Sequence, residues 1–126
     1  MNLSIINKYK ISFQNQIIEW DTKDKEISKT IITNNSYLST FLIDWDSISE
    51  INELLIPGID EALGNPNAEI DNGSATINII IKNDVVIFYD NHSPSSVYRL
   101  PTLDFKEVIL SWREFLATPP LNGSKV

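Results

Sequence analysis

The stretch ATINIIIKNDVVIFYD, residues 75–90, carries the clearest folding signal in this chain. Two runs rich in β-branched and aromatic residues flank Asn83-Asp84, a dipeptide typical of a two-residue hairpin turn. Because side chains alternate along a strand, Ile77, Ile79 and Ile81 share one face, which we expect to be buried. The stretch therefore predicts an antiparallel β-hairpin.

Further strands are predicted outward from this hairpin. Tyr9, Ile11 and Phe13 alternate with polar residues, and the alternation changes phase before Ile18, which indicates a turn or bulge near Asn15. A polar turn is expected at residues 21–26. Most of the runs are separated by short turns, so antiparallel pairing is expected. The predicted strands cover residues 8–14, 16–21, 27–33, 37–45, 68–71 and 97–100.

A first helix is predicted to start at Asp46 or Ser47. Ser47 is followed three residues later by Glu50, which is the spacing of a capping box. Pro57 should end or kink the helix, because proline lacks the N–H that the helix needs. A last turn is expected to follow the kink and to stop at Gly64.

A second helix is predicted at residues 103–117, after Pro101 and before Pro119. Leu103 and Leu110 lie almost opposite its apolar stripe, where they would pack under loops or meet a partner. The stripe itself suits a core-facing helix and consists of Phe105, Val108, Ile109, Trp112, Phe115 and Leu116.

These elements predict an α+β fold with a mainly antiparallel sheet of about five to six strands and two helices packed on it. The length of 126 residues fits one domain, which we place at residues 1–118. Residues 119–126 are expected to form a disordered tail. The chain has no cysteine, which excludes disulfides and thiolate zinc sites.

The charge of the chain is unevenly distributed. The net charge is −7, and residues 30–81 hold eight acids and no lysine or arginine. Such a surface repels phosphate, so we expect binding neither to nucleic acid nor to anionic membranes. It attracts a basic protein or a cation, although acidity also serves plain solubility.

The eight acids come from one continuous region around the first predicted helix. Carboxylates without interspersed bases repel each other, which suggests selection for a negative surface. We therefore take as candidate partner-binding residues Asp44, Asp46, Glu50, Glu53, Asp60, Glu61, Glu69 and Asp71.

No catalytic motif is found. A calcium-binding EF-hand loop starting at Asp44 would need Gly and Glu where Ser49 and Leu55 stand. Asp44 and Asp46 would share one strand face, which leaves weak cation binding open. His92 is the only histidine, and its short loop, which also holds Asp90, indicates a turn rather than a triad. We expect no enzyme, cofactor or metal; a small enzyme that uses Asp90 or Asp44 is the alternative.

The N-terminal sequence MNLSIINKYK lacks the basic head and long apolar run of a signal peptide. No apolar run approaches the roughly 20 residues that span a membrane. The expected location is the cytoplasm.

The closing segment VYRLPTLDFKEVILSWREFLATPP, residues 97–120, carries a family resemblance. Its Leu-Pro-Thr sequence, then Phe105, an apolar pair, Trp112, Phe115 and Leu116, resembles the C-terminal helix of small bacterial immunity proteins. These include the antidotes of contact-dependent growth inhibition and other polymorphic toxin systems. The resemblance covers about the last quarter of the chain.

The resemblance implies an inhibitor that binds its cognate toxin domain, often a nuclease, and blocks the active site in the cytoplasm. The acidic region agrees, because nuclease domains that grip phosphate are basic. Contact residues vary among such proteins, so none is carried over to this chain. The alternative is a small acidic protein-binding adaptor unrelated to toxins, and the oligomeric state stays open.

Overall fold

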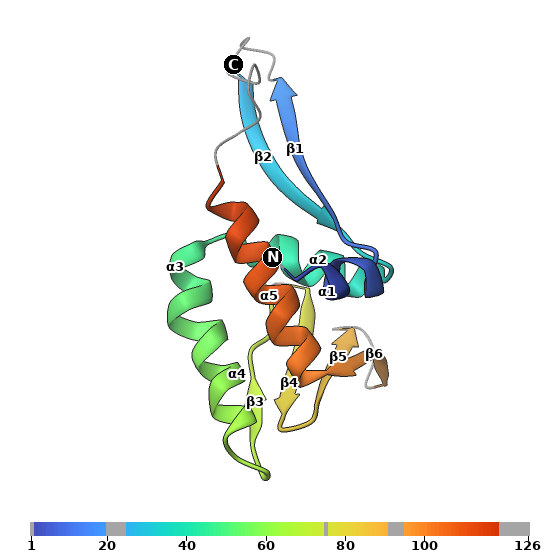
Figure 1. The fold of residues 1–126 in the computed structure, drawn as a ribbon, viewed down its shortest axis with the longest axis vertical. Coiled ribbons are helices and arrows are strands. Elements are labelled where there is room, and N and C mark those ends of the chain that lie inside the picture. The colour runs from blue at the N-terminus through green and yellow to red at the C-terminus, as the bar shows by residue number, and fades with distance from the viewer. Residues whose placement is uncertain (1, 20–24, 75, 91–94, 119–126) are drawn as a thin grey trace.

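The computed structural model describes residues 2–19, 25–74, 76–90 and 95–118 (Figure 1). The predicted C-terminal tail, most of the polar turn at 21–26, and His92 lie outside these residues. The elements in chain order are α1 (Leu3–Lys8), β1 (Ser12–Glu19), β2 (Lys25–Ile32), α2 (Ser36–Asp44), α3 (Ile48–Glu50), the π-helical turn η1 (Ile51–Leu55), α4 (Ile56–Leu63), β3 (Glu69–Asp71), β4 (Ile77–Lys82), β5 (Val85–Asp90), β6 (Ser96–Pro101) and α5 (Thr102–Leu116).

The α+β class and the antiparallel pairing are confirmed, but the prediction of one sheet with two helices is wrong in detail. The described strands form two sheets: a two-stranded ribbon, β1-β2, and a four-stranded sheet in the order β3-β4-β5-β6. Strand order in the larger sheet follows chain order, because short turns join antiparallel neighbours.

The predicted hairpin forms β4 and β5 of the larger sheet. Ile79 pairs with Phe88, and the chain turns at Asn83-Asp84 as expected. Ile77, Ile79 and Ile81 are buried together on one face. The helices cover this sheet, with α4 packed on β3 and β4, and α5 on β5 and β6 (Figure 1).

The strand predicted at residues 37–45 is wrong: residues 37–44 lie in helix α2, and Trp45 caps its C-terminal end. The side chain of Asn35 caps this helix by accepting hydrogen bonds from the N–H groups of Tyr37 at 2.9 Å and Leu38 at 3.3 Å. Leu38, Phe41 and Leu42 are fully buried on one side, at the three- and four-residue spacing of a helix. The cap and this spacing outweigh the β propensity of the aromatic residues.

The N-terminal prediction is also wrong. Residues 3–8 form α1, capped by the side chain of Asn2, and the strand that follows runs through Asn15 without a turn. The change in hydrophobic phase does not mark a bulge, because β1 and β2 pair in unbroken register, with Asn15 opposite Lys29. Figure 1 shows this ribbon projecting from the rest of the molecule.

Helix α1 ends in a Schellman motif with an unusual residue. Lys10 has a φ of 50°, and the N–H of Ile11 reaches back to the carbonyl of Ile6 at 2.9 Å. This left-handed position normally holds glycine, because a side chain there costs about 1–2 kcal/mol.

Lys10→Gly is therefore expected to raise the free energy of unfolding by about 0.5–1 kcal/mol. Glycine removes the strain at this position, but part of that gain is lost because an unfolded chain with glycine has more conformational entropy. Urea unfolding monitored by circular dichroism measures the change. Lys10→Ala is the control, since it removes the lysine side chain but keeps a Cβ in the strained position. Equal stabilisation by both variants would mean that the strain is not the cause.

Residues 48–63 form one bent helix, made of α3, η1 and α4. Ser47 caps its start by accepting from the N–H of Glu50 at 3.3 Å, and Gly64 ends it, both as predicted. The π-helical turn lies directly before Pro57, where the helix must accommodate a residue without an N–H. Gly58 allows close packing here, because a Cβ at this position would lie 2.5 Å from Nδ2 of Asn72.

The core lies between the larger sheet and the helices. Phe41 of α2, Phe88 of β5 and Phe105 of α5 meet with ring centroids 5.5–6.1 Å apart. Trp112 is fully buried and donates from Nε1 to the carbonyl of Trp45 at 2.8 Å. The predicted stripe of α5 is confirmed as core at four positions, while Phe115 and Leu116 are partly buried.

Candidate interaction surface

All eight candidate acids are exposed, and they lie on or beside the bent helix. Four belong to the helix itself, two to the segment that leads into it, and two to strand β3, against which α4 packs. We call this set the acidic surface; it comprises Asp44, Asp46, Glu50, Glu53, Asp60, Glu61, Glu69 and Asp71.

The bent helix separates its charges from the core by simple periodicity. Its fully buried residues are Ile51, Leu55, Ile59 and Ala62, so the intervening Glu50 and Glu53 face outward. Leu54 is 55% exposed beside them and is a large apolar side chain on the outer face of this helix.

The side chain of Asn72, which follows strand β3, joins this strand to the bent helix. Nδ2 of Asn72 donates to the carbonyl of Leu54 at 3.3 Å, directly after Glu53 in the chain. The same amide lies against Gly58. The segments that carry Glu53 and Asp71 are therefore in contact, although the two residues are far apart in sequence.

Two of the eight acids have basic partners from outside residues 30–81. Oδ1 of Asp60 lies 2.7 Å from Nζ of Lys106, and Oε1 of Glu69 lies 3.6 Å from Nζ of Lys82. Both pairs are exposed and contribute little to stability. They do neutralise part of the charge, so the acidic surface is less negative than its sequence suggests.

The other six acids make no ion pair with any described residue. Asp44 accepts a hydrogen bond from Oγ1 of Thr76 at 3.2 Å, which leaves its charge in place. The six are Asp44, Asp46, Glu50, Glu53, Glu61 and Asp71.

The prediction that Asp44 and Asp46 share one strand face is wrong, because no strand exists there. Asp44 ends α2, and Asp46 lies in the link before the cap of the bent helix. Among the described side chains, no cluster of three or more histidines or acids is placed to hold a metal ion.

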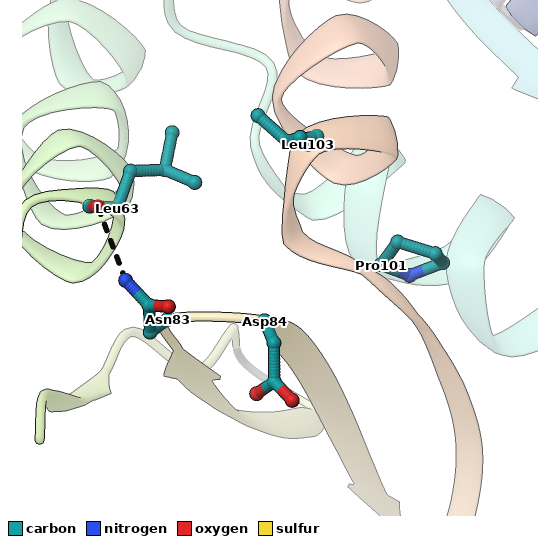
Figure 2. Close-up of a pocket in the computed structure, with 5 residues that line it drawn as sticks. All are labelled: Leu63, Asn83, Asp84, Pro101 and Leu103. Atoms are coloured by element: carbon teal, nitrogen blue, oxygen red, sulfur yellow. Dashed lines mark hydrogen bonds between the residues drawn. The ribbon is translucent and has the colours of Figure 1, made fainter. Parts of the chain in front are cut away.

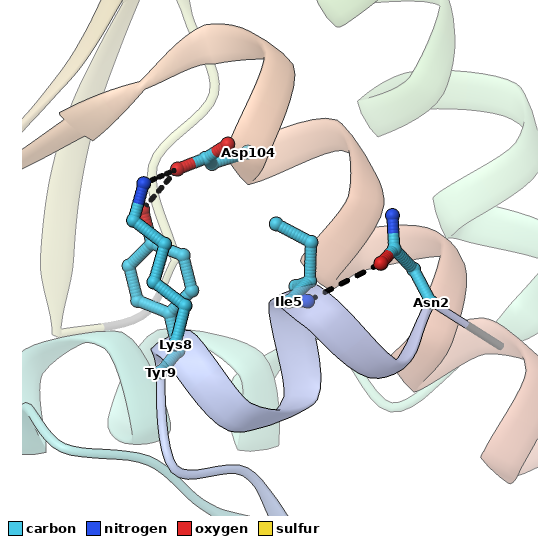
Figure 3. A network of polar contacts seen from close by, with 5 residues as sticks. All are labelled: Asn2, Ile5, Lys8, Tyr9 and Asp104. Atoms are coloured by element: carbon cyan, nitrogen blue, oxygen red, sulfur yellow. Dashed lines mark hydrogen bonds and ion pairs between the residues drawn. The ribbon is translucent and has the colours of Figure 1, made fainter.

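A second polar cluster joins the two ends of the chain (Figure 3). Oδ2 of Asp104 accepts hydrogen bonds from Nζ of Lys8 at 2.7 Å and from the hydroxyl of Tyr9 at 2.6 Å. Burial, followed by the hydrogen bond to Asp104, raises the pKa of Tyr9 well above its usual value. Burial alone would raise the pKa of Asp104, but the two donors outweigh it and lower that pKa. The cluster fastens α1 to the first turn of α5.

No sequence signal pointed to this cluster. Asp104 is 95 positions from Tyr9, and the strand predicted at residues 8–14 placed Tyr9 on a sheet. The N-cap Asn2 could have revealed the helix, since its side chain accepts from the N–H of Ile5 at 3.2 Å.

The structure also contains an open cavity of about 430 Å³ where α4, the β4-β5 turn and the start of α5 meet (Figure 2). Nδ2 of Asn83 donates to the carbonyls of Ala62 at 2.9 Å and Leu63 at 3.1 Å, which closes the end of α4. The N–H of Thr102 donates to the carbonyl of Asp84 at 3.1 Å. The lining residues are Leu63, Asn83, Asp84, Pro101 and Leu103.

Within the described residues, no helix combines the length and the apolar character that crossing a bilayer requires. Comparison of the chain with protein-family models, with curated proteins and with solved structures finds no match.

Proposed function

We propose that this protein is an immunity protein, which binds and neutralises a basic toxin domain through the acidic surface. The observation that carries the proposal is that six exposed carboxylates, which have no basic partner among the described residues, lie on or beside one bent helix. A toxin that is a nuclease fits best, because a domain built to grip phosphates presents lysine and arginine. Carboxylates on a rigid helix can occupy the positions that phosphates would take.

The gain from such a surface lies mainly in encounter rate and selectivity. Opposite charges steer two proteins together and raise the association rate, and salt weakens this effect. Buried ion pairs contribute less to affinity, because both charges must first lose water. An interface also needs apolar anchors near its centre, and exposed Leu54 is placed to provide one.

The same surface would also serve an acidic adaptor that binds a basic protein other than a toxin. Genomic neighbourhood separates the two functions, since a toxin gene next to this one favours immunity. The decisive material is therefore the purified toxin domain encoded by the adjacent gene.

Reversing two charges on the bent helix tests the proposal. Glu50→Lys combined with Glu53→Lys is expected to weaken binding to that toxin domain about 10- to 100-fold at low salt, since close charge pairs across interfaces couple by roughly 1.5 kcal/mol or more. Both side chains are exposed, so the fold should be unaffected. Titration calorimetry and protection in a nuclease assay give the affinity and the inhibition.

The matched control is Glu107→Lys combined with Glu114→Lys on α5, which changes the net charge by the same amount away from the acidic surface. This variant should bind nearly as well as the unchanged protein. Full protection by the Glu50 and Glu53 variant, or an association rate that is the same at low and high salt, would refute the proposed surface.

A further inference from the structure

We propose that the cavity between α4 and α5 receives a lysine or arginine side chain of the partner protein. The inference rests on the proposed function and deepens it, because it adds a specific anchoring site next to the acidic surface. Glu61 of that surface stands in the same last turn of α4 as Leu63, which lines the cavity, whereas the neighbouring Asp60 is paired with Lys106.

The cavity has an apolar part suited to an aliphatic stem. The side chains of Leu63 and Leu103 point toward each other across it (Figure 2). Leu103 is 67% exposed in the first turn of α5. An aliphatic stem lying between the two leucines would cover this surface.

The polar part of the cavity consists of hydrogen-bond acceptors. The amide nitrogen of Asn83 is used by the two carbonyls at the end of α4, so this side chain offers its oxygen. Asp84 contributes a carboxylate, which points away from the leucines (Figure 2). A ligand that carries several N–H donors beyond an apolar stem satisfies both parts, and lysine and arginine have this form.

The start of α5 does not make this an anion site. Its first turn has no side-chain cap, and free N–H groups at a helix start favour negative charge. However, Asp104 stands in that turn and the carbonyl of Asp84 occupies the N–H of Thr102, so the chain itself supplies the negative partners. A further anion would meet the carboxylate of Asp84, which lines the cavity.

Small amides that mimic single residues test the site without a partner protein. N-acetyl-arginine amide and N-acetyl-lysine amide, titrated into ¹⁵N-labelled protein, should give saturable shifts of the backbone resonances of Asn83, Asp84 and Leu103. N-acetyl-norleucine amide keeps an aliphatic stem without charge, and N-acetyl-glutamate amide carries the opposite charge. Both should bind more weakly by about tenfold or more, the effect of losing one charge-assisted hydrogen bond.

Two variants and one control locate the binding. Leu103→Asn and Asp84→Asn should each weaken the arginine probe, and both positions are exposed, so the fold should persist. Leu54→Asn is the matched control, because Leu54 is a similarly exposed leucine that lies in η1 and does not line the cavity, so this variant should leave probe binding unchanged. The inference would be overturned if the norleucine or glutamate amide bound as tightly as the arginine amide, or if Leu103→Asn left the affinity for the arginine amide unchanged.

The toxin domain separates this inference from the proposed function. If Leu103→Asn leaves toxin affinity unchanged while reversal at Glu50 and Glu53 lowers it, the cavity is not an anchoring site and the proposed function stands. If the adjacent-gene toxin does not bind at all while the arginine probe binds as described, the proposed function fails and the cationic chemistry of the cavity is retained.

Discussion

Replacing Trp112 with alanine is expected to lower the free energy of unfolding by about 3–5 kcal/mol, as for other large core aromatics. Trp112 is fully buried in the middle of α5, and its indole N–H bonds the carbonyl of Trp45. The substitution removes the ring, opens a cavity and leaves that carbonyl without its donor. Since domains of this kind have a total stability of roughly 5–15 kcal/mol, the variant should be close to unfolding.

Urea unfolding followed by far-ultraviolet circular dichroism measures this loss without relying on tryptophan fluorescence. Trp112→Phe separates the two contributions, because it keeps an aromatic ring but lacks the N–H; it should cost clearly less than alanine. Leu103→Ala on the same helix is the control and should change stability by no more than about 0.5 kcal/mol, because Leu103 is exposed. If Trp112→Ala and Leu103→Ala lowered the free energy of unfolding by similar amounts, the face of α5 that carries Trp112 would not be the buried face.

Replacing Asp104 with asparagine is expected to cost about 2 kcal/mol at neutral pH. The carboxylate accepts charge-assisted hydrogen bonds from Tyr9 and Lys8, and each such bond contributes roughly 1.5–3 kcal/mol when shielded from water. We expect a total cost near the lower end of this range, because Lys8 is exposed and solvent weakens its hydrogen bond to Asp104. Loss of the cluster should loosen α1 from α5.

The pH dependence of this cost follows from the two pKa shifts. The pKa of Asp104 is lowered in the folded protein, so its contribution is present above the unfolded value of about 3.9 and is lost as pH falls below it. The pKa of Tyr9 is raised, so its contribution is present below about pH 10 and is lost as pH rises above that value.

The stability difference between the unchanged protein and Asp104→Asn should therefore shrink as the pH falls below about 4, toward the lowered pKa of folded Asp104, as measured by urea titration at each pH. The difference for Tyr9→Phe should shrink above about pH 10 instead. Glu107→Gln, on the same helix, is the control for a general loss of negative charge. A pH-independent cost of Asp104→Asn would mean that the carboxylate charge has no part in the cluster.

The parts of the fold that could be predicted are those with strong local signals. The β4-β5 hairpin has Asn83-Asp84 between two runs rich in β-branched residues, and α5 has an apolar stripe that includes the buried Trp112. Ser47 and Gly64 marked the ends of the bent helix because capping depends on neighbouring residues alone.

The mistaken strand at residues 37–45 shows where local signals compete. Its Tyr, Phe and Trp residues favour strands, yet the same residues also fit the spacing of a helix. The side chain of Asn35 decides between the two, because it caps the start of the helix. Burial of Phe41 against Phe88 then stabilises the helix. This contact joins segments that are distant in the sequence, so local signals do not reveal it.

The candidate surface was predictable in composition but not in pairing. The absence of bases from residues 30–81 is visible in the sequence, and all its acids prove exposed. Lys82 and Lys106 reach Glu69 and Asp60 only because β4 and α5 fold alongside β3 and α4. The cavity was beyond prediction for the same reason, since its lining comes from three separate segments.

The projecting ribbon has a consequence for how the molecule opens. Its side chains contact the C-terminal end of α5 in three ways: Phe13 stacks on Phe115 at 4.8 Å, Nζ of Lys29 lies 4.3 Å from the centroid of the Phe115 ring, and Lys29 donates a hydrogen bond at 3.0 Å to Thr118, just after the helix. These contacts lie at the far end of α5 from Phe105 and its aromatic neighbours Phe41 and Phe88. The outer part of the ribbon is therefore expected to open first, so that its amide protons exchange with solvent sooner than those of the four-stranded sheet, whereas the end of β2 at Ile31 stays fixed in the core.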